Sequence, residues 1–324
     1  MDLFDGLKSK IEGKEISVVF PEGNDARIIG AAVRLAADKL LKPILLGDPE
    51  EIHELGKSHG FVTSMVEIID PTKYDKRQEL VDGFVERRAG KATVEQAEAL
   101  MDNANYFGTM MVYLGYADAL VSGAVHSTGD TVRPALQIIK TKPGVSRTSG
   151  AFIMTKRNET YLFSDCAINI NPNAQELAEI AVESAKTAEL FNIEPKVAML
   201  SFSTKGSGAG PDVDKVVEAT RIAKELAPEY EIDGELQFDA AFVPTVAKLK
   251  SPDSKVAGQA KVFVFPEIQS GNIGYKIAQR LGGYEAFGPI LQGLNKPVSD
   301  LSRGCNEEDV YKLSIITAAQ TLMD

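Results

Sequence analysis

The sequence predicts an α/β protein with mostly parallel strands and helices on both faces of the sheet. Short, nearly continuous apolar segments alternate with amphipathic helical segments over residues 15–69, a pattern typical of βαβ units. A stretch with Pro, Gly and Ser at 142–149 interrupts this pattern, and two short strands follow it as a hairpin. We therefore expect two domains, residues 1–146 with 298–324 and residues 147–297, with an active-site cleft between them.

Size and composition fit a globular protein of the cytoplasm. The chain has 324 residues, of which 44% are hydrophobic and 25% charged. Its formal net charge of −11 argues against a nucleic-acid partner, so an anionic substrate has to be held by a few local Arg and Lys residues. The N-terminus lacks a signal-peptide core, and no apolar run reaches the roughly 18 residues of a membrane span. We expect no membrane partner.

The first half contains four expected strands and five expected helices. The strands lie at 15–21, 43–46, 66–69 and 117–125, and the helices at 26–41, 49–59, 76–90, 93–116 and 135–140. The helix 76–90 ends in Arg87 and Arg88, where cations complement the helix C-terminus. Two adjacent residues lie about 100° apart around a helix, so both arginines cannot face one ligand. A solvated helix end is the simpler interpretation of this pair.

The strand 117–125 leads directly into a loop rich in hydroxyl groups. This loop, His126 to Pro134, contains Ser127, Thr128 and Arg133. Hydroxyls and backbone N–H groups at the carboxyl edge of a sheet are typical of an anion site, and Arg133 adds a fork-shaped donor for phosphate. His126 fits an ordinary loop histidine equally well, and we assign it no role.

The second half repeats the strand–loop–helix pattern. We expect strands at 150–155, 160–164, 196–202, 234–239 and 261–265, and helices at 174–190, 213–227 and up to 281. The loop at 203–211 lacks the Walker arrangement because its lysine precedes the glycines, and no GxGxxG motif follows the first strand. Three Gly- and Ser-rich loops, around 127, 206 and 272, favour a large ligand that carries phosphate.

The stretch 296–309 combines a hydroxyl, a guanidinium and several carboxylates. Pro297 and Gly304 indicate a loop, while Asn306 and Asp309 have the spacing of a capping box at the start of a helix from 307 to 323. Ser302 and Arg303 then lie on the loop and Asp309 in the first helical turn. A helix start with charged neighbours is the simpler alternative. The two cysteines, Cys166 and Cys305, form neither a disulfide framework nor a zinc pattern.

Several motifs in register resemble the phosphate acetyltransferase (phosphotransacetylase) family, the phosphate acetyl/butyryltransferases. They are Asp300-Leu301-Ser302-Arg303-Gly304 with Asp309, His126-Ser127-Thr128 through Arg133-Pro134, Ser164-Asp165-Cys166-Ala167, Ser207-Gly208-Ala209-Gly210 and Gly271-Asn272-Ile273-Gly274-Tyr275-Lys276. The resemblance runs from about residue 15 to the C-terminus. It implies a two-domain, three-layer α/β/α fold like that of the isocitrate and isopropylmalate dehydrogenases, usually assembled as a homodimer.

The resemblance also implies a reaction and residue roles. The family interconverts acetyl-CoA plus phosphate with CoA plus acetyl phosphate. In this sequence Asp309 matches the proposed general base for the CoA thiol, and Ser302 and Arg303 match residues that stabilise the reacting acyl phosphate. The resemblance thus implies an acyltransferase in which CoA and acetyl phosphate bind together in a ternary complex. The CoA thiolate then attacks the acetyl group directly. Coenzyme A is then a substrate, with no tightly bound cofactor and no metal.

Further matches concern substrate binding. Arg87, rather than Arg88, matches a substrate-binding arginine, and Arg133 matches another. Asn272 and Lys276 match positions in a glycine-rich binding loop of the family. The expected partners are small molecules only: CoA, acetyl phosphate and phosphate.

The sequence also has to be weighed against other functions. A phosphate butyryltransferase differs only in the volume of the acyl pocket, and a non-catalytic acetyl-CoA-sensing module keeps the same fold. A dehydrogenase of this architecture needs a metal-binding carboxylate cluster and a nicotinamide site, and neither is found in the sequence. Cys305 beside Arg303 raises an acyl-cysteine intermediate as a further alternative, although the CoA thiol already supplies a nucleophile.

Overall fold

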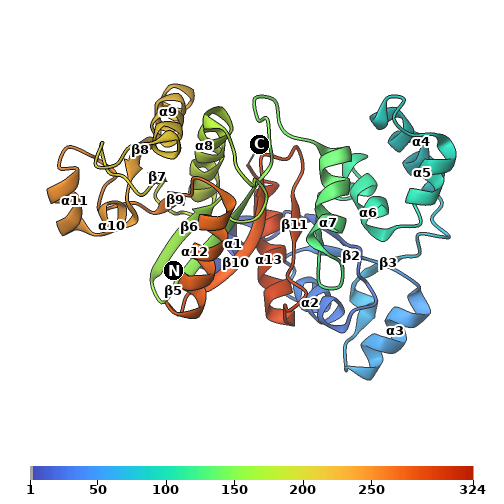
Figure 1. The fold of residues 1–324 in the computed structure, drawn as a ribbon. Helices are drawn as coiled ribbons and strands as arrows, with labels where there is room; N and C mark the ends of the chain where they lie inside the picture. The colour runs from blue at the N-terminus through green and yellow to red at the C-terminus, as the bar shows by residue number, and fades with distance from the viewer. Residues whose placement is uncertain (1–2, 324) are drawn as a thin grey trace. The chain divides into compact units, whose positions relative to one another are not determined.

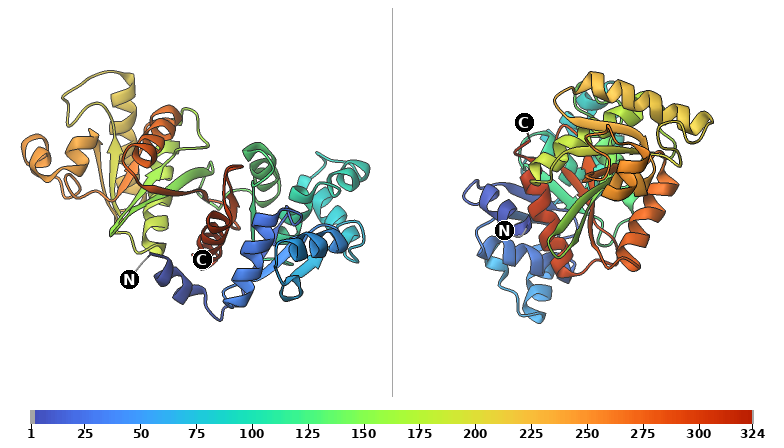
Figure 2. Two further views of the ribbon diagram at one scale, coloured as in Figure 1. Left: turned by 90° about the horizontal axis from the view of Figure 1, so that it is seen from below. Right: turned by 90° about the vertical axis from the view of Figure 1, so that its left-hand side faces the viewer.

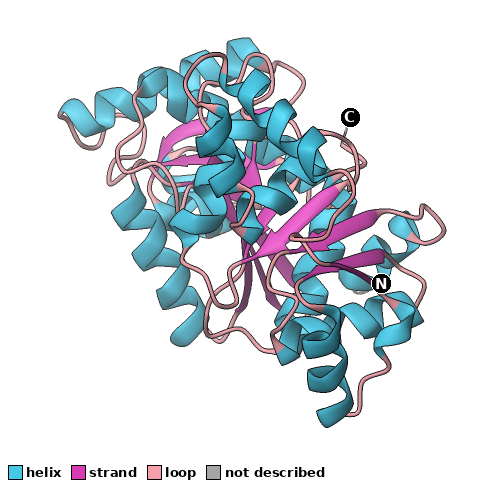
Figure 3. Cartoon of the chain, turned by 90° about the vertical axis from the view of Figure 1, so that its right-hand side faces the viewer, coloured by secondary structure: helices cyan, strands magenta, loops and turns pink. Residues whose placement is uncertain are grey.

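The computed structural model describes residues 3–323 and is a mixed α/β protein (Figure 1). The chain divides into two compact units, one reaching to Thr141 and resuming at Leu294, the other running from Lys142 to Gly293. Helices flank the strands in both units (Figure 3). The α/β class predicted from the sequence is confirmed.

The strands of the first unit are all parallel, in the order β3-β2-β1-β4-β11. Their bounds are β1 (Ser17–Phe20), β2 (Lys42–Leu46), β3 (Glu67–Ile69), β4 (Ala119–Ser122) and β11 (Val298–Asp300). The central strands β1 and β4 are buried along almost their whole length, which explains why they are apolar without alternation.

The helices of this unit cover the sheet and set its loops. They are α1 (Leu3–Ile11), α2 (Ala26–Ala37), α3 (Pro49–Ser58), α4 (Arg77–Arg88), α5 (Val94–Leu100), α6 (Ala104–Tyr113), α7 (Thr128–Pro134) and α13 (Glu307–Gln320), with a 3-10 turn η1 (Thr63–Met65) and a π-helical turn η2 (Ala135–Ile139). Helix α13 packs against both α1 and α2 (Figure 2). The C-terminal helix therefore belongs to the core of the first unit, although the second unit separates it in sequence from α1 and α2.

The second unit contains a mixed sheet in the order β10-β5-β6-β9-β7-β8. Strands β5 (Ser149–Lys156) and β6 (Glu159–Ser164) form the expected antiparallel hairpin, and β10 (Glu285–Gln292) pairs antiparallel with β5. Strands β7 (Lys196–Leu200), β8 (Glu231–Leu236) and β9 (Val262–Val264) continue the sheet in parallel.

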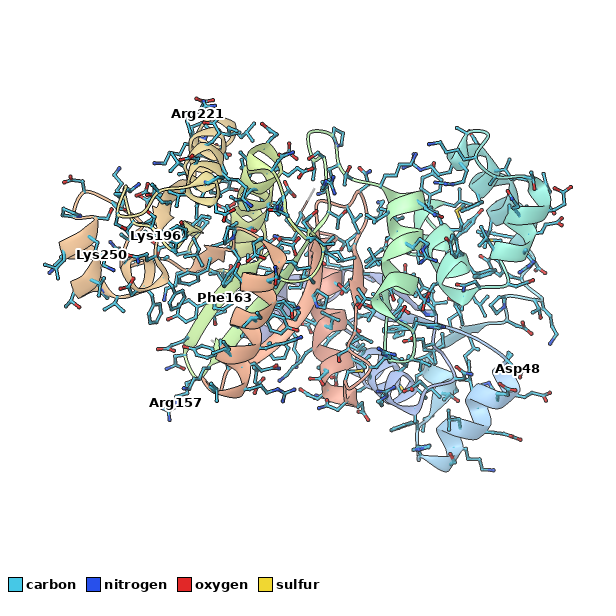
Figure 4. All side chains as sticks on the ribbon, in the orientation of Figure 1. Asp48, Arg157, Phe163, Lys196, Arg221 and Lys250 are labelled. Atoms are coloured by element: carbon cyan, nitrogen blue, oxygen red, sulfur yellow. The ribbon has the colours of Figure 1, made fainter. Side chains whose placement is uncertain are left out.

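Aromatic side chains fill much of the core of the second unit. Phe163 packs against Phe263 and Phe265, with ring centroids 5.6 and 5.3 Å away (Figure 4). The helices of this unit are α8 (Ala174–Leu190), α9 (Pro211–Leu226), α10 (Phe238–Phe242), α11 (Pro244–Lys250) and α12 (Ile268–Arg280). At the surface of α9, Arg221 makes ion pairs with Glu218 and Glu225 (Figure 4).

Two expected loops are helical in the structure. Helix α7 begins at Thr128, within the expected loop 126–134, because the Ser127 backbone N–H and hydroxyl both donate to Asp130 and start a helix there. Helix α12 begins at Ile268, capped by Glu267, so Asn272 and Lys276 lie on a helix instead of in a glycine-rich loop.

The glycines of α12 serve close packing. A Cβ atom at Gly271 would lie 2.3 Å from the carbonyl oxygen of Asp165, and one at Gly274 would lie 3.0 Å from the Phe265 ring. The helix can approach the turn after β6 only because these side chains are absent. A sequence pattern that is typical of a loop therefore reflects a tertiary contact.

Three other boundaries also differ from the expectation. The expected helix 93–116 is two helices, because the Asn103 side chain accepts from Asn105 N and Tyr106 N and starts α6 anew. The stretch expected to be loop after Pro297 begins with strand β11. Strand β8 starts at Glu231, not at 234, and its charged Asp233 is paired with Lys205 and Lys224.

Candidate active site

Three loops leave adjacent strands at the carboxyl edge of the first unit's sheet. They follow β1, β4 and β11, which are neighbours in the strand order. The strand order changes direction between β1 and β4, the position at which open α/β sheets tend to bind ligands. Ser127, Ser302 and Arg303 lie on these loops, and Thr128, Arg133 and Asp309 lie on the helices that follow them.

The loop after β11 carries Ser302 and Arg303, both exposed, and leads into α13. The Ser302 carbonyl accepts from Cys305 N at 2.9 Å, and its hydroxyl accepts from Gly304 N at 3.3 Å. A tight turn thus brings the chain from β11 to the start of α13 and leaves the Ser302 and Arg303 side chains accessible to a ligand.

Asp309 forms the capping box predicted from the sequence, and that prediction is confirmed. Its Oδ2 accepts from Asn306 N at 2.9 Å, while its own N–H donates to Asn306 Oδ1 at 2.9 Å. Only one carboxylate oxygen is needed for this cap. Among residues 3–323, no hydrogen bond is described for the other oxygen of this half-buried side chain.

The loop after β4 carries Ser127 and Thr128 into α7. The Ser127 hydroxyl donates to Asp130 Oδ2 at 2.7 Å, and this bond lowers the pKa of Asp130. Arg133 lies in the last turn of α7, exposed to solvent. Because the helix begins at Thr128, Arg133 is held on a helix and not on a flexible loop.

Glu22 and Arg27 were not singled out from the sequence, yet they connect all three loops. We refer to residues 22–27, which run from the turn after β1 into the first turn of α2, as the charged turn. The Glu22 side chain is 1% exposed and accepts from four successive backbone N–H groups, residues 123–126, at 2.8–3.1 Å. The His126 Nδ1 also lies 2.8 Å from Glu22 Oε1. The whole loop after β4 is thus fixed by one carboxylate.

Arg27 binds carbonyl groups where Glu22 binds N–H groups. Its guanidinium donates to Ala124 O at 2.9 Å and to Arg303 O and Cys305 O at 3.0 Å each. Asp25 holds the same guanidinium through both carboxylate oxygens, at 2.8 and 3.0 Å, and its own pKa is lowered by Arg27. The loops after β4 and β11 therefore meet at one arginine. The available sequence signal for this arrangement was the presence of two charged residues, Glu22 and Arg27, shortly after the first buried strand.

Asp300, the last residue of β11, is a buried carboxyl without full hydrogen bonding. It is 1% exposed, and its Oδ1 has no hydrogen-bond partner among residues 3–323. Burial raises the pKa of Asp300 to about 6, with the nearby Glu22 acting in the same direction. The Thr128 and Thr131 side chains act in the opposite direction and lower this pKa, while the buried Ser122 hydroxyl, opposite Asp300 in the sheet, has no hydrogen-bond partner in the described chain.

The two cysteines do not form a nucleophilic site. Burial raises the pKa of the Cys305 thiol to about 11, although the Arg27 guanidinium acts in the opposite direction. Burial also raises the pKa of the Cys166 thiol well above its ordinary value. Both thiols are therefore protonated near neutral pH, and Cys305 Sγ only accepts a long contact of 3.7 Å from Arg27.

Arg87 is anchored to the backbone at the end of η2. Its Nε donates to Ile138 O at 2.6 Å and one terminal nitrogen to Ile139 O at 3.0 Å, and its guanidinium lies 4.9 Å from the centre of the Tyr113 ring. The positive charges of Arg87, Arg88 and Lys91, that of Arg87 foremost, lower the pKa of Lys140 together with partial desolvation, so these cations lie near Lys140.

Asn272 and Lys276 belong to the second unit. Asn272 Nδ2 donates to Cys166 O at 3.0 Å and thus fixes the turn after β6, while Lys276 is exposed with its Nζ 5.7 Å from the Tyr275 ring.

A cavity of about 450 Å³ opens beside the charged turn. Its lining combines residues after β1, β2, β3 and β4 with the start of α6: Pro21, Glu22, Asn24, Leu46, Gly47, Pro71, Asp102, Asn103, Ala104, Val125 and His126. The lining contains two carboxylates and no Lys or Arg. It is therefore unsuited to a phosphate group by itself.

Neither a metal-binding cluster nor a membrane-spanning helix occurs in residues 3–323. Nowhere in this part of the chain do three or more His, Cys, Asp or Glu side chains come together as a metal site would require. Within the same residues, every helix is too short or too polar for a transmembrane span.

Comparison with known proteins gives full-length matches. A family model described as phosphate acetyl/butaryl transferase matches residues 2–318. The phosphate acetyltransferase of Bacillus subtilis is 61% identical over 321 residues, 99% of each chain. Two solved structures are also similar: a phosphotransacetylase from Streptococcus pyogenes (62% identity, TM-score 0.97) and the EutD phosphotransacetylase from Staphylococcus aureus (60% identity, TM-score 0.94). Each alignment covers 99% of this chain and 98% of the other.

Proposed function

Since the chain belongs to the phosphate acetyl/butyryl transferase family, we propose that it reversibly transfers an acetyl group between acetyl phosphate and coenzyme A. The observation that carries this proposal is the placement of Ser302, Arg303 and Asp309 on one exposed turn and the first turn of α13. A carboxylate, a hydroxyl and a guanidinium are the groups that a thiol, a developing oxyanion and a phosphate leaving group require.

We assign the roles as follows. The Arg303 guanidinium carries the charge of the phosphate and improves it as a leaving group, while Ser302 donates to the acyl oxygen. Asp309 takes the proton of the CoA thiol as that sulfur attacks the acyl carbon. The carbon–sulfur bond forms as the bond to the phosphate oxygen breaks, and phosphate leaves.

Asp309 as base raises a quantitative question. A free thiol and a free Asp differ in pKa so much that full proton transfer costs roughly 6 kcal/mol. Its place at a helix N-terminus, where it accepts from Asn306 N, stabilises the carboxylate further. We therefore infer that proton removal is concerted with attack, with arginine stabilising the thiolate, or that closure of the site desolvates Asp309.

Anion binding by Arg87 and Arg133 is part of the same proposal. Arg87, Arg88 and Lys91 lie near Lys140, and within residues 3–323 no ion pair is described for Arg88, Lys91 or Lys140. In a chain with a net charge of −11, such a local cluster of cations favours a polyanionic ligand. Ser127 and Thr128 at the start of α7, with Asn272 and Lys276, complete the proposed binding residues.

The direct route is favoured over an acyl-cysteine. The Cys305 thiol is buried with a pKa of about 11, so little thiolate exists near neutral pH. We propose coenzyme A as a substrate that is released each cycle, with no tightly bound cofactor, and a homodimer acting in the cytoplasm. Light scattering of the purified chain tests the dimer.

Phosphate release from acetyl phosphate, with and without CoA, tests the function. We expect turnover that depends on CoA and is faster with acetyl than with butyryl phosphate; a preference for butyryl phosphate would favour the phosphate butyryltransferase alternative. No turnover with either would overturn the proposal and favour a non-catalytic acetyl-CoA-sensing module.

The variant Asp309→Asn tests the role of the base. Its remaining oxygen can still accept in the capping box, so the fold should be retained while kcat falls by roughly 10²–10⁴-fold. The matched control is Glu176→Gln, in the Asn173–Glu176 capping box of α8. Near-normal turnover of Asp309→Asn would exclude the base role, whereas Glu176→Gln should retain kcat.

A further inference from the structure

The charged turn has no part in the chemistry assigned above, yet it bonds to both loops that carry the proposed reacting groups. Glu22 occupies the N–H groups of residues 123–126. These donors are therefore unavailable to a substrate phosphate, so the carboxylate shapes the loop and does not share it with a ligand. Anion binding by this loop has to come from residues after His126.

Arg27 provides the complementary half. Its three carbonyl acceptors lie on two loops that are far apart in sequence: Ala124 is on the loop after β4, and Arg303 and Cys305 are on the loop after β11. Two of these acceptors flank Gly304, in the tight turn that displays the Ser302 and Arg303 side chains. The position of that turn relative to the loop after β4 is thus set by the geometry of one guanidinium.

A guanidinium suits this task because its five N–H donors have a fixed planar arrangement. Asp25 holds one edge of the plane bidentately, and the remaining donors reach the carbonyls. A lysine at this position could supply the charge but could not reach acceptors on both loops with defined directions. The charge of Arg27 alone therefore does not account for the arrangement.

We propose that the charged turn is a clamp that holds the loops after β4 and β11 in their reactive arrangement, with Arg27 as the positioning residue. The inference rests on the proposed function for Ser302, Arg303 and Asp309. Arg27 touches no substrate in this scheme. It acts through the backbone of the Arg303 turn, and a displacement of about 1 Å in a reacting group is enough to lower a rate by roughly 100-fold.

The matched control is Arg34, which lies on the same helix α2. It pairs with Glu308 near the start of α13 and stacks on the Tyr311 ring at 3.8 Å, but it bonds to neither loop. The pair Arg34–Glu308 is partly exposed, with 41% and 45% of the two side chains accessible. Replacing Arg34 therefore removes an arginine contact between α2 and α13 without releasing the Arg303 turn.

The test compares Arg27→Lys, Arg27→Ala and Arg34→Lys. We expect kcat to fall about 10-fold in Arg27→Lys and about 100-fold in Arg27→Ala, with KM changed less than kcat. Added guanidinium ion at millimolar concentration should restore part of kcat in Arg27→Ala only. Arg34→Lys should stay within about twofold of the unmodified chain. Normal kcat in Arg27→Lys, or losses of equal size in Arg34→Lys, would overturn the clamp.

Hydrogen–deuterium exchange separates failure of the clamp from failure of the proposed function. In Arg27→Ala the amides of residues 123–126 and 302–306 should exchange faster, whereas in Arg34→Lys they should not. If the unmodified chain has no transferase activity, the proposed function fails, but faster exchange in Arg27→Ala still supports the clamp. Unchanged exchange in Arg27→Ala overturns the clamp whatever the activity.

Discussion

In both units, a buried carboxylate after a buried strand accepts hydrogen bonds from backbone N–H groups of a loop, but the cation nearby differs. In the first unit Glu22 follows β1 and binds the N–H groups of residues 123–126. In the second, Asp165 follows β6, is 2% exposed, and accepts from Gly150 N and from the N–H groups of residues 167–169 at 2.8–3.1 Å. A buried carboxylate surrounded by backbone donors is thus a general way to fix a loop in this protein.

The difference lies in the cation that binds carbonyl groups. Arg27 reaches three carbonyl oxygens on two loops, whereas Lys215 in the second unit reaches only Asn171 Oδ1 and Pro266 O, at 2.8 and 2.9 Å. A planar fork fixes directions, while an ammonium group acts as a point charge. The residues proposed to react are on the unit that has the arginine. We infer that a buried carboxylate is enough to stabilise a loop, and that the loops with the proposed reacting residues also need the planar guanidinium of Arg27.

The largest expected effect comes from removing each buried carboxylate in turn. Glu22→Gln and Asp165→Asn both place an amide N–H₂ among backbone donors, so each should lower the free energy of unfolding by about 3 kcal/mol. Their effects on catalysis should differ. Glu22→Gln should lower kcat, since Arg27 joins the loop that Glu22 holds to the turn with Ser302 and Arg303, while Asp165→Asn should mainly raise KM, because Asn272 contacts the turn that Asp165 holds.

Urea unfolding and steady-state kinetics at low temperature measure both quantities on the folded fraction. Gln78→Glu, at an exposed position of α4, is a control for a change of one charge in the opposite direction, without burial. Equal losses of kcat in the two variants would contradict the distinction drawn between the units.

The next effect concerns Asp300, a buried carboxyl that lacks the donors that surround Glu22 and Asp165. Its pKa is raised to about 6 from the ordinary 3.8, so the folded chain binds a proton that the unfolded chain has released. Its contribution to stability is therefore present at low pH and lost as pH rises from about 4 to 6. The full loss is about 3 kcal/mol.

Asp300→Asn should remove this pH dependence, because the amide stays neutral throughout. Between about pH 4.5 and pH 7.5 the variant should gain about 2 kcal/mol of stability relative to the unmodified chain, as measured by urea unfolding at each pH. Asp70→Asn is the control with the opposite sign, since hydrogen bonds from Thr72 and Lys73 lower the pKa of this half-buried carboxyl to about 2. An unchanged pH profile in Asp300→Asn would show that Asp300 is ionised at no cost.

The sequence predicts what local interactions decide. The capping box of Asn306 and Asp309 spans three residues, and the turn with Ser302 and Arg303 precedes it directly, so both could be recognised without the fold. The α/β class and the β5–β6 hairpin likewise follow from local patterning. The capping box and the turn are thus the part of the candidate site that does not depend on tertiary contacts.

Long-range contacts decide the rest. Glu22 and Arg27 act on residues 97 to 278 positions away, and nothing in their neighbourhood indicates which carbonyls and N–H groups they meet. The glycines of α12 are an instructive error, since Gly271 is required by the carbonyl of Asp165 and not by a loop. Such residues become interpretable only when the partner is known.

The smallest expected effect concerns Lys215, the cation of the second unit that is compared with Arg27. Lys215 is half-buried and donates to two loop acceptors, so Lys215→Met should cost about 1 kcal/mol of unfolding free energy and leave kcat within about twofold. Lys224→Met is the matched control on the same helix, because it removes one of two lysines that pair with Asp233 and touches no loop after β6 or β9. If Lys215→Met instead lowered kcat as strongly as Arg27→Lys, a point charge would position loops as well as a fork does, and the second unit would share in placing the reacting groups.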